Sequence, residues 1–232
     1  MRDAANLSDS RGFKRQKPLV LEVRDELERM ILEGEVPAGE RLNEHSLAMQ
    51  MGVSRAPVRD AARSLAADGL VTAVANEGVY VRKLSLEDAL ELYDLRAMLA
   101  GMLCARVAER AEESVRVHLR RQVVAMAQAI EDRDEEAYFT INNSFHSDVA
   151  DAARMQRPAA LYKSLGKEVR LFRFQVLTGT AALRISNEEH DRIVAAIEAG
   201  DAQAASQAGS QHHLNGKSRL LALSESAISE ET

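Results

Sequence analysis

A short run of basic and small residues has the composition of a segment that contacts duplex DNA. Arg55 and Arg59 are four residues apart, so a helix here would carry both on one face, beside the small residues Ala56 and Pro57. A guanidinium fork donates two hydrogen bonds to guanine O6 and N7, or to a phosphate. Ser54 and the free N–H groups of the first helical turn can also hold a phosphate. The run therefore predicts a helix that reads DNA; the alternative is an ordinary solvated arginine face.

Three histidines in separate predicted helices could bind a metal ion. His146, His190 and His212 supply imidazoles, and Asn142 lies one helical turn before His146, on the same face. Three imidazoles and one oxygen ligand suit a borderline divalent ion such as Zn²⁺, Ni²⁺ or Mn²⁺. His213 competes with His212 but lies about 100° further around the helix. The alternative is that each histidine is satisfied singly by a carbonyl group or by water.

The elements around the arginines have the pattern of a winged helix-turn-helix. Apolar residues at helical spacing predict three helices, which begin at Pro18, Asn43 and Ser54. Asn43 and Ser54 are predicted N-caps. Two β-prone runs, 70–74 and 79–82, surround an Asn-Glu-Gly turn and predict a hairpin. Two helices with a tight break, followed by a hairpin, are typical of this DNA-binding motif.

The remainder of the chain is expected to be helical, because Pro is scarce and Ala is abundant. The predicted fold class is mainly α: an N-terminal winged helix-turn-helix and a C-terminal antiparallel all-α bundle of about six helices. The helices are expected at about 86–110, 113–132, 134–153, 158–178, 186–200 and 201–222. The predicted organisation is a disordered basic arm (1–17), the DNA-binding domain (18–83), the helical domain (84–223) and a frayed tail (224–232).

Charge and cysteine content exclude several classes of protein. The net charge is -6, but residues 1–83 carry equal numbers of basic and acidic side chains, so the excess acid lies in the helical part. The single cysteine, Cys104, excludes an internal disulfide and is expected to be a buried thiol. There is neither a secretion-type apolar region at the start nor a run of about 18 apolar residues, so we expect a cytoplasmic protein without membrane contact.

The N-terminal motifs resemble those of GntR-type regulators. The matching runs are Gly39-Glu40-Arg41-Leu42-Asn43-Glu44, Gly52-Val53-Ser54-Arg55-Ala56-Pro57-Val58-Arg59-Asp60-Ala61 and Asp68-Gly69-Leu70-Val71. The resemblance implies that five residues lie in or beside the major groove: Ser54, Arg55, Ala56, Pro57 and Arg59. It also implies that Gly78, on the wing, approaches the minor groove. His45 stands where the family often has an Arg that touches DNA, and a neutral His weakens this contact or makes it pH-sensitive.

The C-terminal part resembles the FCD ligand-binding domain of the FadR subgroup. The stretches that carry the resemblance are Phe145-His146, Glu189-His190-Asp191-Arg192-Ile193-Val194-Ala195-Ala196-Ile197 and Gly200-Asp201-Ala202-Gln203-Ala204-Ala205 leading to His212. In such domains an Asp and three His bind a divalent metal. Here Asn142 replaces the Asp, which removes a negative charge and should lower the affinity or shift the metal preference. Arg96 matches an Arg that helps to hold an organic acid; Arg170 and Arg173 are weaker candidates.

These resemblances imply a transcription regulator, and most such regulators repress. A homodimer joined by its C-terminal helices would bind a pseudo-palindromic operator, and a small carboxylate effector would modulate its affinity. Two alternatives remain. One is a DNA-binding regulator whose helical domain is a structural dimerisation domain without an effector. The other is a metal hydrolase with three His ligands and Glu189 as its base, although we expect no enzyme.

Overall fold

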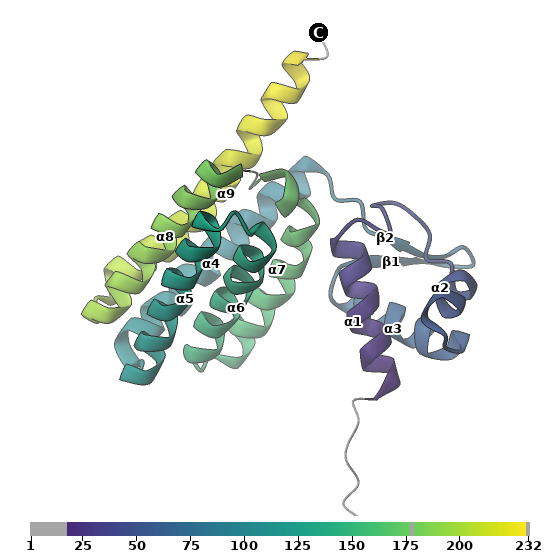
Figure 1. Cartoon of the computed structure of the whole chain (residues 1–232), viewed down its shortest axis with the longest axis horizontal. Helices are drawn as coiled ribbons and strands as arrows, with labels where there is room; N and C mark the ends of the chain where they lie inside the picture. The colour runs from purple at the N-terminus through teal and green to yellow at the C-terminus, as the bar shows by residue number, and fades with distance from the viewer. Residues whose placement is uncertain (1–17, 177–178, 231–232) are drawn as a thin grey trace, which may run out of the picture.

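The computed structural model describes residues 18–176 and 179–230. The N-terminal unit contains three helices and a two-stranded antiparallel hairpin (Figure 1). Its elements are α1 (Leu19–Leu32), α2 (Glu44–Met51), α3 (Arg55–Ala67), β1 (Val71–Val74) and β2 (Gly78–Val81). This order confirms the predicted winged helix-turn-helix, with the hairpin as its wing. The expected basic arm at 1–17 lies outside the described residues.

The turn between α2 and α3 follows from its capping residues. The Asn43 side chain accepts hydrogen bonds of 3.1 Å from the backbone N–H groups of His45 and Ser46, as an N-cap should. Gly52 ends α2 in the left-handed conformation, which turns the chain into α3. Ser54 occupies the N-cap position of α3, but its side chain makes no capping hydrogen bond. The predicted N-cap position is therefore confirmed, but the exposed Ser54 hydroxyl does not cap the N–H groups of α3.

Six helices follow and form the bundle that Figure 1 shows beside the N-terminal unit. They are α4 (Leu86–Arg110), α5 (Glu113–Glu131), α6 (Glu135–Ala152), α7 (Gln156–Val176), α8 (Gly179–Ala199) and α9 (Ala202–Glu230). The mainly α fold class is confirmed. Among the described helices, none is long and apolar enough to cross a membrane.

Two helix boundaries differ from those predicted. Helix α8 begins at Gly179 rather than at 186, and α9 continues to Glu230 rather than ending at 222. Residues 224–230, which were expected to be a frayed tail, are therefore helical. The reason is that the chain has neither Gly nor Pro between 217 and 230, so no residue there breaks a helix.

Helices α4 and α9 pack closely along the bundle because small residues face each other across their contact. A Cβ atom on Gly209 would lie 2.7 Å from the Sγ of Cys104, so only glycine fits this position without displacement. Cys104 is buried, as predicted, and burial raises the pKa of its thiol to about 12. A thiol held in its protonated form and away from solvent is a packing residue.

Helix α7 joins the bundle to the DNA-reading unit. It contacts α1 directly, and Figure 1 shows it as the bundle helix beside α1. Leu171 of α7 packs against two apolar clusters, the core of the N-terminal unit and a smaller cluster where α4, α7 and α9 meet. A movement of α7 would therefore change the packing in both parts of the molecule.

Candidate DNA interface and metal centre

The first turn of α3 presents its basic side chains to solvent. Arg55, Ala56 and Arg59 are exposed and Pro57 is half-buried, while Val58 on the opposite face is fully buried. The apolar face thus fixes the orientation of the helix and directs both arginines outward. The one ion pair of Arg55 among the described residues, to Glu44 of α2, is long at 3.5 Å. Such an exposed pair is weak, so a phosphate or a base edge can replace the carboxylate.

The wing carries a further arginine, Arg41, that was not predicted as a DNA contact. Gly78 has φ +124°, and a Cβ atom there would lie 2.8 Å from Nε of Arg41. Arg41 is exposed and pairs with Tyr80 of β2 in an isolated β-bridge, so its side chain lies along the hairpin. His45 is also exposed, at the start of α2. Arg41 belongs to the run that carries the family resemblance, but only the fold brings it beside the wing.

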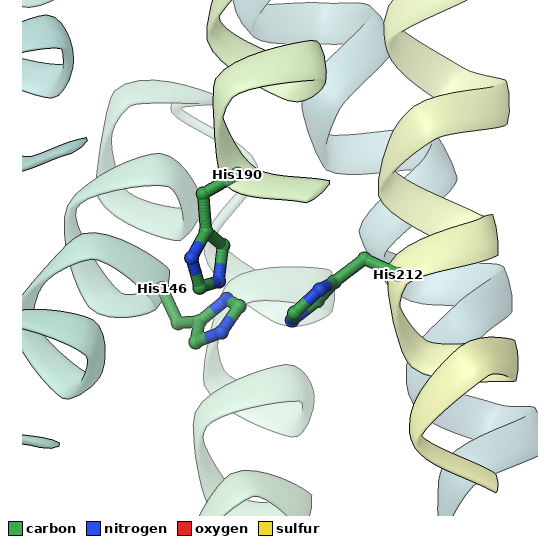
Figure 2. A group of neighbouring side chains, drawn as sticks. All are labelled: His146, His190 and His212. Carbon is green, nitrogen blue, oxygen red and sulfur yellow. The ribbon is translucent and has the colours of Figure 1, made fainter. Parts of the chain in front are cut away.

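The three predicted histidines meet inside the bundle. His146 of α6, His190 of α8 and His212 of α9 offer nitrogen atoms that all lie within 4.8 Å of one another. Figure 2 shows the three rings converging from three helices. The ring centres are 5.2 Å apart for His146 and His190, and 4.5 Å for His190 and His212. Three separated segments of the chain therefore supply one cluster.

Neighbouring groups determine which nitrogen of two of these rings can bind an ion. Nδ1 of His212 donates a 2.7 Å hydrogen bond to the carboxylate of Glu189, which leaves Nε2 available. The Tyr162 hydroxyl lies 3.1 Å from Nδ1 of His146 and 2.9 Å from Nε2 of His213. If His146 binds through Nε2, its Nδ1–H donates to Tyr162, whose hydroxyl then donates to His213.

Burial keeps the imidazoles neutral. It lowers the pKa of His146 and of His213 well below the ordinary value of 6.5, and the neighbouring histidines lower both further. Burial also lowers the pKa of His212, although the charge of Glu189 opposes this shift. A neutral imidazole is the form that ligates a metal, so these rings are in the binding state at neutral pH.

Glu189 is the anion that holds the cluster in place. Burial alone would raise its pKa, but hydrogen bonds from His212 and Arg219 lower it to about 2. Asn215 and Arg219 each donate a 2.9 Å hydrogen bond to its Oε1 atom. The carboxylate is thus ionised and fully engaged.

The donor set fits a divalent metal ion. Two ligands of a tetrahedral site with bonds of about 2.1 Å are about 3.4 Å apart, so the rings need only draw together from their present spacing. Asn142 is buried and lines the same cavity as His146 and His212, and its amide oxygen would be the fourth ligand in such a site. With Asn in this position all four donors are neutral, and the positive charge of an ion would be left to an incoming anion.

A cavity of about 260 Å³ lies between the histidines and the N-terminal unit. Arg96 lines it and is buried, with its guanidinium 4.4 Å above the ring centre of Tyr162. Among the described residues no carboxylate pairs with Arg96: its Nη1 donates a long hydrogen bond of 3.5 Å to the backbone oxygen of Tyr162, and its Nε has no hydrogen-bond partner. Gly166 makes room for it, because a Cβ atom there would clash with the guanidinium. A buried cation without an anion favours an anionic ligand.

The structure brings the predicted metal residues together and adds others. His213 does not turn away from the site as predicted. It is buried and lines the cavity, because the offset from His212 places it on the adjacent wall. Glu189 was predicted only as the base of the hydrolase alternative, and Arg219 was not predicted as a site residue. Arg219 follows His212 by seven residues, two helical turns, and this spacing is a signal the sequence does contain. The side chain of Arg173 lies outside the described residues.

Comparisons with known proteins identify both the N-terminal unit and the helical bundle. The model of bacterial regulatory proteins of the gntR family matches residues 19–81, and the model of the FCD domain matches residues 91–215. The YdhC protein of Bacillus subtilis, named as an uncharacterized HTH-type transcriptional regulator, is 30% identical over 84% of this chain and 88% of its own length. A probable D-xylose utilization operon transcriptional repressor of Paenarthrobacter nicotinovorans is 31% identical, over 82% of this chain and 84% of its own.

Solved structures share the arrangement of the elements. E. coli McbR/YncC superposes with a TM-score of 0.77 at 22% identity, covering 89% of this chain and 98% of its own. A putative transcriptional regulator GntR from Rhodococcus sp. RHA1 gives a TM-score of 0.72 at 26% identity, covering 88% of this chain and 97% of its own. The first likeness, at its low identity, concerns the fold alone.

Proposed function

This chain belongs to the gntR family of bacterial regulatory proteins, with an FCD domain behind its DNA reader, and we propose that it is a cytoplasmic repressor controlled by a small carboxylate. It is a transcription regulator, like its curated relatives. We propose that it represses rather than activates, that it binds a small carboxylate and a divalent metal ion, and that the residues named below bind the DNA, the metal and the effector. The domain limits at 18–83 and 84–223 are part of the same proposal.

We assign DNA reading to the first turn of α3 and to the wing. Arg55 and Arg59 contact base edges or phosphates in the major groove, with Ser54, Ala56 and Pro57 beside them. His45 contacts the DNA from the start of α2, and Gly78 approaches the minor groove. Support comes from the exposure of the basic side chains and from the buried face that orients the helix.

The histidine cluster and Arg96 form the proposed effector site. His146, His190, His212 and Asn142 hold a divalent ion, which when bound supplies a Lewis-acidic anchor for a carboxylate. Arg96 donates hydrogen bonds to the same acid from the cavity wall. The observation that carries this proposal is a buried arginine, without an acid partner among the described residues, in a cavity beside three converging imidazoles.

A homodimer joined through the bundle is also proposed. Helix α4 carries Leu95, Met98 and Met102 at helical spacing on its outer face, and they are 42%, 65% and 48% exposed. An apolar stripe of this kind on a helix surface suits an interface with a second copy. Two chains would then present two α3 helices to the two halves of an operator.

The metal-hydrolase alternative is not favoured by the state of Glu189. A general base needs a pKa near the working pH and a free lone pair. Glu189 instead accepts hydrogen bonds from His212, Asn215 and Arg219, and its pKa is about 2. Its geometry suits a residue that positions His212.

The proposed function is tested by isolating genomic DNA fragments that the full-length protein retains, then titrating the complex with a panel of organic acids. Metal content is measured on the same preparation. We expect a retained fragment with a pseudo-palindromic sequence, a bound divalent metal and release of DNA by at least one acid. DNA binding that is unaffected by every acid and by removal of the metal would favour the effector-free alternative.

A further inference from the structure

Glu28 belongs to the DNA-reading unit, yet its side chain lines the effector cavity of the bundle. It lies on α1, and its carboxylate reaches two cations of α7. Oε1 is 3.8 Å from Nη1 of Arg170, and Oε2 is 3.9 Å from Nζ of Lys167. Both cations also line the cavity. A carboxylate of the reader thus lies where a ligand carboxylate of the bundle could bind.

The two ion pairs between Glu28 and α7 are long. Neither reaches hydrogen-bond distance, whereas Nζ of Lys167 donates a 2.8 Å hydrogen bond to Asp68, the C-cap of α3. Among the described residues, the only ion pair of Arg170 is the one with Glu28. Arg24, one turn away on α1, lies 3.3 Å from Glu28 and would remain beside it after displacement. Glu28 is therefore the replaceable partner of this group, and Asp68 the firmly held one.

Glu28 and Arg170 also separate two hollows of the molecule. Both residues line the effector cavity and a groove of about 650 Å³ between α1 and α6. Burial lowers the pKa of Arg170, and the charges of Glu28 and Glu33 oppose that shift. A partly buried guanidinium needs an anion at close range, whether from the chain or from a ligand.

The size of the cavity limits the acid that can bridge its two ends. One water-sized group needs about 10–15 Å³ of such a volume, so a cavity of about 260 Å³ has room for a small dicarboxylate. One carboxylate would lie at Arg96 and the histidines, and the other would lie between Lys167 and Arg170.

We propose that the effector is a dicarboxylate whose second carboxylate displaces Glu28 from Arg170 and Lys167, so that binding removes the ion pairs between α1 of the DNA reader and α7. This inference rests on the proposed function, because it uses the same acid site. The ligand and Glu28 compete for the same cations, so the effector favours any arrangement of the two units in which Glu28 has withdrawn. By linkage, that arrangement changes the DNA affinity by no more than the difference in effector affinity.

Calorimetric titration of the full-length protein tests the proposal with matched probes. These are the straight-chain diacids from malonate to adipate, and the monoacids with the same numbers of carbons. We expect at least one diacid to bind more tightly than its matched monoacid. Arg170→Gln should weaken that diacid about tenfold and leave the monoacid unchanged, since it removes a charged hydrogen-bond donor.

Glu28→Gln tests the competition directly. It keeps the shape of the side chain but removes its charge, so the diacid should bind at least about fivefold more tightly. Glu22→Gln, an exposed position on the same helix, is the matched control and should change nothing. Equal binding of diacid and monoacid in the wild type and in all variants would overturn the inference while leaving an acid effector in place. If no acid of either series binds, the proposed acid effector fails as well.

Discussion

Glu189 shows how a single buried acid can determine the properties of the histidine site. It fixes the ring of His212 through Nδ1 and is itself fixed by Asn215 and Arg219. A carboxylate behind a ligating imidazole orients the ring and increases its basicity. The acid thus contributes to metal binding although it is not itself a ligand.

Glu189→Gln should lower the affinity of the full-length protein for Zn²⁺ by about 10- to 100-fold. The amide keeps the size of the side chain but loses the charge that holds the Nδ1 proton of His212. Competition with a chromophoric chelator measures the change. Glu188→Gln is the matched control, since Glu188 is exposed and precedes it directly. Equal affinities in the two variants would contradict the role given to Glu189.

The buried histidines predict a loss of stability in mild acid. The unfolded chain binds a proton at each histidine near pH 6.5, whereas His146, His212 and His213 have lower pKa values when folded. The unfolded state therefore holds more protons below this pH. The free energy of unfolding should fall by up to about 1.4 kcal/mol for each pH unit and each histidine.

Urea denaturation of the metal-free protein at pH 7.5 and pH 5.5 measures this dependence. His213→Asn should reduce the difference between the two values, and the exposed His45→Asn serves as control. Equal free energies at both pH values in the wild type would show that the imidazoles are not buried neutral.

The packing of helix α9 against α4 positions His212 in the site. Gly209→Val should lower the free energy of unfolding by about 1–3 kcal/mol, because the added methyl groups have no space beside Cys104. Gln207→Val makes a similar change at an exposed position of α9 and controls for helix propensity. The urea midpoints of the two variants give the comparison. A midpoint shift no larger than that of Gln207→Val would contradict the close packing.

The local sequence predicts most of these elements because their ends have clear signals. Asn43 caps α2, Gly52 ends it, and the hairpin forms around the predicted turn. The boundaries that differ are those without such signals, at Gly179 and beyond residue 222. Between Gly179 and the predicted start at 186 the chain has no Asn, Asp or Ser that marks a start, and beyond residue 222 neither Gly nor Pro marks an end, so the exact ends could not be predicted from local pattern.

At the scale of the whole molecule, spacing and family resemblance selected His146, His190 and His212, and the fold brings them together. The partners that make them a site were not predictable in this way. Tyr162 and Glu28 come from helices distant in sequence and have no local signal. Tertiary contact alone joins them to the cavity, and through Glu28 and α7 the cavity reaches the reader.

The first turn of α3 is proposed to lie against DNA bases, and the operator affinity of Arg59→Ala measures this contact. Fluorescence anisotropy at one moderate salt concentration, with Arg192→Ala on exposed α8 surface as control, measures the effect. We predict that Arg59→Ala weakens binding by about 1–3 kcal/mol while the control leaves it unchanged. An affinity equal to that of the wild type would contradict the claim.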